Sequence, residues 1–285
     1  MIILPLVLSA ALAAGETLDS SPVDHVPSLL LSNLTAEPAT AIIQDEEEEG
    51  PPIDEWVGQV TLGATFAEGN TDSTTVSAAI DAAKHYGNGD VWTLGLNWNY
   101  TEQNDADGTS IARRIEGRTK YDIVLDDVSY VWLNGNIQND TPLDNDLPEL
   151  DLRWTIGAGY GYKVIENDEW MWGLEAGLAL FSEDFASSPT DPLAPSPSDQ
   201  YLSARVASVS KWVYSEKTNF SNYLELYPSL EESDDVYGRS DTRATTQLTD
   251  NILGQFRWIW DWDNTPGSGR ERSDHLFLIT VGWGF

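Results

Sequence analysis

A sustained alternation of apolar and polar side chains is the feature that most constrains the fold of this 285-residue chain. Clear examples are the runs from Trp92 to Tyr100 and from Leu152 to Tyr162. Alternate side chains of a β-strand point to opposite faces of a sheet. Each run therefore predicts a strand with one apolar, aromatic face and one face of Gly, Thr, Asn and charged residues. The runs last about 10 to 13 residues, whereas strands of soluble proteins typically have about 5 to 6.

The length of the runs distinguishes between two folds that alternating strands can form. A soluble sandwich buries its apolar face against a second sheet, whereas a membrane barrel turns that face to lipid and keeps the polar face inside. A tilted strand of about 10 residues is long enough to cross a bilayer. Beyond the N-terminal segment, no apolar run reaches the roughly 18 residues that a membrane helix needs. If the chain spans a membrane, it must therefore do so with strands.

The expected connections alternate between short turns and loops, most of which are much longer. The turns are Gly87–Asp90, Asp126–Asp127, Glu166–Glu169, Ser215–Thr218 and Thr249–Asn251, and the loops are Glu68–Asp72, Glu102–Ala112, Asp140–Glu149, Ser182–Asp199, Glu231–Asp235 and Asp263–Ser273. Short periplasmic turns and longer outside loops are typical of outer-membrane barrels. We predict an all-β fold, a transmembrane antiparallel up-and-down β-barrel of about 12 strands, with both chain ends in the periplasm.

The last run ends the sequence on an aromatic residue. Its apolar positions are Phe277, Ile279, Val281, Trp283 and Phe285. An alternating apolar strand that ends in this way resembles the assembly signal of bacterial outer-membrane barrels. We expect these residues to act as such a signal and the barrel-assembly machinery to be a partner.

The residues before the barrel divide into two segments. Residues 1–13 contain an apolar stretch and an A-x-A pattern at Ala11 and Ala13, which predicts a signal peptide. Residues 14–55 are acidic, contain no Lys or Arg, and are expected to form a disordered periplasmic tail. A docking arm for a basic partner is the alternative reading of this tail. Residues 56–285 form the predicted outer-membrane barrel.

The composition excludes several classes of function. A net charge of -32 argues against a nucleic-acid partner, because phosphate binding needs Lys and Arg. The chain has no Cys, which excludes disulfides, Cys-ligated zinc and a Cys nucleophile. Its 12 Trp and 11 Tyr fit the aromatic girdles of a barrel in contact with outer-membrane lipids and lipopolysaccharide.

A series of short motifs resembles one known family. Gly69–Thr75, Thr119–Asp122, Leu152–Tyr162 and Glu225–Leu230 are similar, in the same order, to blocks of the salt-induced outer-membrane protein family (YdiY-like), a barrel family described as a domain of unknown function. The resemblance covers roughly residues 58–285. It implies an outer-membrane barrel and no particular activity, cofactor or catalytic residue.

The candidates for chemistry are few. His85 and His275 are expected at opposite ends of the barrel, so they cannot share a site, and Ser273 beside His275 is expected to be an ordinary loop residue. The segment Asn104–Gly108 slightly resembles a calcium loop. The twelfth position counted from Asp105 is Glu116, however, which the strand phase directs into the barrel. We therefore predict no enzyme activity, no cofactor and no metal site.

The inward face carries most of the basic residues. The strand phase directs Arg114, Glu116, Arg118, Lys120, Asp122, Arg153, Lys163, Arg205, Lys211, Arg239, Asp241, Arg243 and Arg257 into the lumen, together with Asp81, Asp151, Glu175, Glu225 and Asp261. Charges inside a barrel either line water or pair with each other. The interior is thus either a salt-bridged, closed core or a narrow pore, in which the basic excess would favour small anions.

Three hypotheses about function follow. The first is a non-enzymatic outer-membrane barrel that acts as a structural element or as a channel for small solutes. The second is a surface binding or adhesion protein that acts through its acidic loops, with divalent cations as possible ligands. The third is a barrel hydrolase. Conductance in a planar bilayer separates the first from the other two.

Overall fold

The computed structural model describes residues 52–67, 72–105, 108–143, 146–187, 196, 198–266 and 270–285. Within these residues the chain forms twelve strands. Their bounds are β1 Trp56–Ala67, β2 Asp72–His85, β3 Val91–Asp105, β4 Gly108–Val124, β5 Ser129–Thr141, β6 Leu150–Glu166, β7 Trp170–Phe185, β8 Ser198–Ser215, β9 Thr218–Pro228, β10 Val236–Gln247, β11 Ile252–Asp263 and β12 Ser273–Gly284. The expected signal peptide, 1–13, and residues 14–51 of the expected tail lie outside the described residues.

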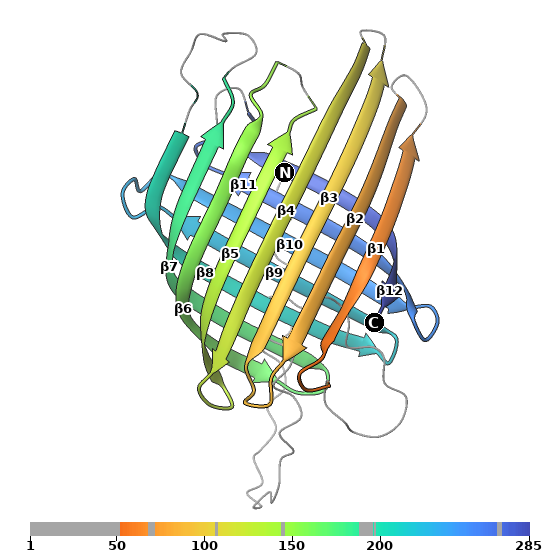
Figure 1. Ribbon diagram of the computed structural model, residues 1–285, viewed down its shortest axis with the longest axis vertical. Helices are drawn as coiled ribbons and strands as arrows, with labels where there is room; N and C mark the ends of the chain where they lie inside the picture. The colour runs from red at the N-terminus through yellow and green to blue at the C-terminus, as the bar shows by residue number, and fades with distance from the viewer. Residues whose placement is uncertain are drawn as a thin grey trace, which may run out of the picture.

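Each strand pairs antiparallel with its neighbours in sequence, and β1 pairs with β12, which closes the barrel. The predicted fold class, an up-and-down barrel of about twelve strands, is therefore confirmed. Figure 1 shows β1 to β5 on the near wall and β9 to β12 on the far wall, with the strands of the two walls crossing obliquely. We call the end with the connections 86–90, 125–128, 167–169, 216–217 and 248–251 the turn end, and the opposite end the loop end.

The outer face of the wall is apolar and carries aromatic residues near both ends. At the turn end, Trp56 lies 5.4 Å from Trp92, measured between ring centroids, and Trp170 stacks on Trp212 at 5.4 Å. Toward the loop end, Trp258 stacks on Phe277 at 5.9 Å. Such girdles flank the lipid-facing band of outer-membrane barrels. An even number of antiparallel strands, closed and apolar outside, makes the chain an outer-membrane β-barrel.

Among the described residues, no helix is long and apolar enough to cross a membrane.

The prediction of a loop at Glu102–Ala112 was wrong. β3 continues to Asp105 and β4 begins at Gly108, so the strands extend through most of the expected loop. Apart from Ala106, Ile111 and Ala112, these residues are polar or Gly, which resembles a loop in sequence. Above the apolar band of a membrane, however, neither face of a strand needs to be apolar, and the backbone ladder continues from Thr101↔Ala112 to Asp105↔Gly108.

A bulge near the start of β6 reverses the expected direction of one side chain. The pairing with β7 shifts between Leu150↔Phe185 and Leu152↔Asp184, which leaves Asp151 as the extra residue. Leu150 is buried and Asp151 is exposed, so the prediction that Asp151 points into the lumen was wrong. A one-residue insertion moves every side chain beyond it to the other face of the strand.

The closure between β1 and β12 depends on Phe285. Its N–H donates to the carbonyl oxygen of Gly58 at 2.9 Å, and the N–H of Gly58 donates back to the carbonyl oxygen of Phe285 at 2.8 Å. A Cβ atom on Gly58 would lie 2.7 Å from the tip of the Phe285 ring, so glycine is needed where this ring crosses β1. Both the backbone and the ring of Phe285 therefore contribute to closure.

Deleting Phe285 should reduce the folded fraction, because the closure loses two backbone hydrogen bonds and the ring over Gly58. The measurement is the intensity of the heat-modifiable folded band on gels of outer-membrane fractions. Phe285→Tyr, which keeps the ring and the backbone, is the matched control and should fold normally. An unchanged folded fraction after the deletion would contradict this account.

Candidate functional site

Charged side chains from opposite walls meet inside the barrel in three clusters. The loop-end cluster contains Arg114, Glu116, Arg239 and Asp261. The central cluster contains Asp81, Arg118, Asp241, Arg243 and Arg257. The β7–β9 cluster contains Glu175, Arg205 and Glu225, together with Lys120 from β4. The phase of the strands directs all of these residues to one face of the sheet, which closure turns into the interior.

The loop-end cluster joins β4 directly to β10 and β11. Arg239 on β10 donates from both terminal nitrogens to the two carboxylate oxygens of Glu116 on β4, at 2.5 and 2.8 Å. Arg114 on β4 contacts Asp261 on β11 at 2.6 Å. The hydroxyl of Tyr237 donates to Asp261 at 2.7 Å. The Arg239–Glu116 contact is bidentate, and bidentate Arg–carboxylate contacts are strong and geometrically specific.

The central cluster is built around two buried carboxylates. Asp241 on β10 accepts from Arg243 and Arg257, with N···O distances of 2.9 and 2.7 Å. Asp81 on β2 contacts Arg243 at 2.9 Å and Arg118 at 2.7 Å. Arg118 lies on β4 and also reaches Asp241 at 3.4 Å. The cluster therefore connects β2, β4, β10 and β11.

The β7–β9 cluster lies against an aromatic wall. Arg205 is fully buried, and it contacts Glu175 at 2.8 Å and Glu225 at 3.3 Å. Its guanidinium also stands 4.3 Å from the ring centroid of Trp132. Lys120 forms an ion pair with Glu175, and the hydroxyl of Tyr130 donates to the same carboxylate at 2.8 Å. Each buried charge in this cluster is therefore paired.

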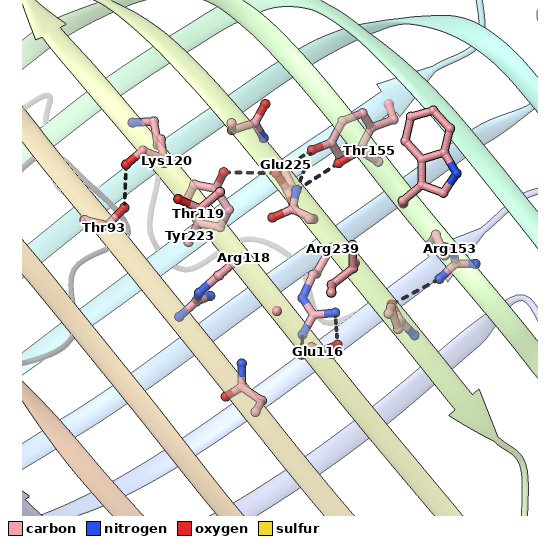
Figure 2. Close-up of a pocket in the computed structure, with 18 of the residues that line it drawn as sticks. Thr93, Glu116, Arg118, Thr119, Lys120, Arg153, Thr155, Tyr223, Glu225 and Arg239 are labelled. Carbon is pink, nitrogen blue, oxygen red and sulfur yellow. Dashed lines mark hydrogen bonds and ion pairs between the residues drawn. The ribbon is translucent and has the colours of Figure 1, made fainter.

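Among the described residues, ion pairs of these clusters cross the middle of the barrel. β4 and β10 are six places apart in the closed ring of strands, so the Glu116–Arg239 pair crosses the lumen from wall to wall. Figure 2 shows this pair beside an interior cavity, with Arg118, Lys120 and Glu225 around it. The cavity has a volume of about 70 Å³. Since a single water needs about 10–15 Å³ measured in this way, it holds only a few waters.

Glycines on β6 and β7 make room for two interior aromatic rings. A Cβ atom would lie 2.4 Å from the Trp132 ring if added to Gly159, and 2.6 Å from it if added to Gly177. A Cβ atom on Gly161 would lie 2.1 Å from the Tyr130 ring. The alternating glycines of the segment Leu152–Tyr162 are thus needed for packing. The rings lie against this wall and contact Arg205 and Glu175 of the β7–β9 cluster.

Sequence reasoning missed the interior aromatic residues. A second group, Phe181, Tyr201, Tyr227 and Tyr237, is buried near the loop end, and the guanidinium of Arg153 lies 4.3 Å from the Tyr237 ring centroid. From the sequence, aromatic residues were expected mainly on the lipid face. The available signal was phase: Tyr130 and Trp132 share theirs with Asn134, Asn136 and Gln138, which are polar.

Two predicted lumen residues, Arg153 and Lys163, and the expected assembly signal lie outside the three clusters. Arg153 lies apart from the clusters, with Glu183 and Asp263 as partners, the latter at 3.6 Å. Lys163 pairs with Glu166 at 3.1 Å near the turn end. The apolar residues of the expected assembly signal, Phe277, Ile279, Val281, Trp283 and Phe285, are exposed on the outer face, and their role in assembly stays a prediction.

The histidines lie at opposite ends of the barrel. His85 ends β2 at the turn end, and His275 lies near the start of β12 at the loop end. Nδ1 of His275 accepts from Trp258 at 3.3 Å, and the Ser273 hydroxyl accepts from Trp260 at 2.6 Å, so neither contact forms a nucleophile–base pair. Within the described part of the chain, no group of three or more His, Asp or Glu residues is arranged to hold a metal ion.

Replacing Arg205 with Met should destabilise the barrel by about 3–5 kcal/mol, because Glu175 and Glu225 would keep buried charges without their shared partner. The measurement is the free energy of unfolding in denaturant for the protein refolded in detergent or lipid. Arg113→Met, on the exposed face of β4, is the matched control and should change this value by less than about 0.5 kcal/mol. Equal changes in the free energy of unfolding would show that the buried ion pairs stabilise the barrel no more than an exposed charge does.

Comparison with known proteins gives one family and several similar folds. No curated protein matches the chain in sequence. The translocator domain of the autotransporter NalP from Neisseria meningitidis has 13% identity over 81% of this chain and 88% of that chain, with a TM-score of 0.48. The COG4313 outer membrane channel from Pseudomonas putida F1 has 13% identity over 85% of this chain and 100% of that chain, with a TM-score of 0.44.

The family model described as "Protein of unknown function, DUF481" matches residues 60–285, which is nearly the whole barrel. The chain therefore belongs to this family.

Proposed function

We propose that the chain is a sealed outer-membrane barrel, without an open path at rest, whose role in the envelope is structural. The observation that supports this most directly is the Glu116–Arg239 pair, which joins opposite walls across the lumen. The Arg118–Asp241 contact joins the same two strands at 3.4 Å. A solute would have to separate these groups to pass. Two buried charges that lose each other must regain water or another partner, which opposes the separation.

An anion-leaning channel receives less support from this geometry. The phase of the strands alone suggests a basic row, but each of its members has acidic partners. Arg114 pairs with Asp261, Arg243 pairs with Asp81 and Asp241, and Arg257 pairs with Asp241. Neutralised guanidinium groups offer an entering anion little net attraction.

We further propose an orientation of the barrel in the membrane, a role without covalent chemistry, and a narrower family for the chain. The turn end faces the periplasm and the loop end faces outside, as in outer-membrane barrels generally. The barrel performs no covalent chemistry, and it contacts outer-membrane lipids and lipopolysaccharide through its apolar wall. We also assign the chain to the salt-induced (YdiY-like) proteins. A rise of its transcript at high salt would support that name, and an unchanged level would oppose it.

Conductance across a planar bilayer tests the seal. The wild type should show no steady conductance steps. The double variant Arg118→Ala with Arg239→Ala should produce them, because both side chains line the residual cavity and close it. Its pore should select cations, since Asp81, Glu116 and Asp241 would keep their charges.

The control removes the same charge from exposed positions. Arg113→Ala with Lys217→Ala changes one residue on the outer face of β4 and one in the β8–β9 turn, so it should stay silent. Steady conductance by the wild type would defeat the sealed barrel. If that conductance were also anion-selective, the channel hypothesis would replace it.

A further inference from the structure

The connection between β11 and β12 contacts the opposite wall at the loop-end mouth of the barrel. Its described residues are 264–266 and 270–272. Arg270 donates from Nη2 to the carbonyl oxygen of Pro148 at 2.9 Å and from Nη1 to the carboxylate of Asp140 at 3.3 Å. Asp140 lies near the end of β5, and Pro148 lies in the β5–β6 connection. Since β11 and β12 are six places from β5 and β6 in the closed ring, the Arg270 side chain bridges the mouth.

Three groups on the opposite side form a cradle around the Arg270 guanidinium. Asp140 supplies a carboxylate, and Pro148 supplies a carbonyl oxygen that also accepts from Nε at 3.3 Å. Phe185 supplies an aromatic ring whose centroid lies 5.3 Å from the guanidinium carbon. A planar guanidinium donates from its edge and stacks through its face, so it can use all three groups at once. The Arg270 side chain is therefore only 14% exposed, although its neighbour Glu271 is exposed.

Backbone hydrogen bonds hold both sides of this bridge. On the β11 side, the N–H of Asp263 donates to the carbonyl oxygen of Arg272 at 2.9 Å, which fixes the connection at the end of β11. On the β5–β6 side, the N–H of Ala186 donates to the carbonyl oxygen of Glu149 at 2.9 Å, which fixes the backbone beside Pro148 to the end of β7. The guanidinium therefore joins two backbone segments that are themselves bonded to the barrel.

A small cavity lies between the bridge and the loop-end cluster. Its lining includes Arg270 together with Arg114 and Asp261 of that cluster, and its volume is about 30 Å³. Since each water needs about 10–15 Å³, the cavity holds about two waters and is too small for a maleimide. Gln138 lines both this cavity and the cavity of about 70 Å³ beside the lumen ion pairs. Its side chain thus lies on the way from the mouth to the lumen.

We propose that Arg270 is a latch that holds the β11–β12 connection across the loop-end mouth and keeps solutes out of the small cavity behind it. The cradle of Asp140, Pro148 and Phe185 is a guanidinium site that the chain fills with its own side chain. A free guanidinium cation presents the same planar donors and competes for this site. The latch lies on the loop-end side of the lumen ion pairs, and it does not depend on whether the lumen conducts.

The reaction rate of a cysteine behind the latch tests the proposal. The chain has no native Cys, so Gln138→Cys supplies a single thiol in the barrel refolded in detergent. The probe is N-ethylmaleimide, which is neutral, so the loss of a protein charge does not itself attract or repel it. We expect Gln138→Cys alone to react slowly and the addition of Arg270→Ala to accelerate the reaction several-fold. Asp140→Asn should also accelerate it, and combining it with Arg270→Ala should give no further increase, because both changes open one latch.

The matched control is Arg272→Ala, which removes the same charge from an exposed position in the same connection and should leave the rate unchanged. Guanidinium chloride, kept well below the concentration that unfolds the barrel, should accelerate the reaction when Arg270 is present and have no effect after Arg270→Ala. Sodium chloride at the same ionic strength should have a smaller effect. The folded band on gels is checked for every variant. Asp263→Cys, at a position that lines the same cavity, replaces Gln138→Cys if that variant fails to fold.

Three outcomes would overturn the proposal. Equal rates with and without Arg270→Ala in folded protein would mean that Arg270 does not close the mouth. An acceleration by Arg272→Ala as large as that by Arg270→Ala would mean that any positive charge in this connection has the same effect and that the cradle has no special role. A guanidinium effect that persists after Arg270→Ala would mean that the cation acts elsewhere on the barrel.

Discussion

The ion pairs that cross the lumen between β4 and β10 are the interaction on which the rest of the interior depends. A charge inside a barrel must either keep its water or find a partner. Glu116, Arg118, Arg239 and Asp241 find partners on the opposite wall, and the cavity beside them holds only a few waters. The interior is therefore closer to the packed core of a small barrel than to a porin channel. Polar residues have here the role that apolar residues have in a soluble core.

Lipid outside the wall gives the apolar face no preference for the protein interior, so backbone pairing and interior packing must stabilise the fold. Both are visible in the wall formed by β5, β6 and β7. Trp132 and Tyr130 occupy the space that Gly159, Gly161 and Gly177 leave empty. The rings in turn lie against Arg205 and Glu175, through a cation–π contact and a hydrogen bond. Small residues on β6 and β7 thus allow a buried charge cluster on β7, β8 and β9.

The period-two pattern was sufficient to predict the strands, because a membrane wall forces apolar side chains outward at alternate positions. It failed where that force is absent or interrupted. Glu102–Ala112 extends beyond the apolar band, and Asp151 is the extra residue of a bulge. Phase could direct Arg239 inward, but it could not name Glu116 as its partner. That pairing depends on the tilt and closure of all the intervening strands, which no local pattern contains.

The ion pairs are unevenly distributed around the closed barrel. Among the described residues, the ion pairs inside the barrel involve strands from β2 to β11, and neither β1 nor β12 contributes to one. The side-chain amide of Gln59 on β1 and the hydroxyl of Thr280 on β12 are buried without hydrogen-bond partners. The two strands are therefore held by backbone pairing with each other and with β2 and β11, without ion pairs in the described part of the chain. The ion pairs of the interior therefore join the strands from β2 to β11, and the β1–β12 ladder with Phe285 closes the ring between them.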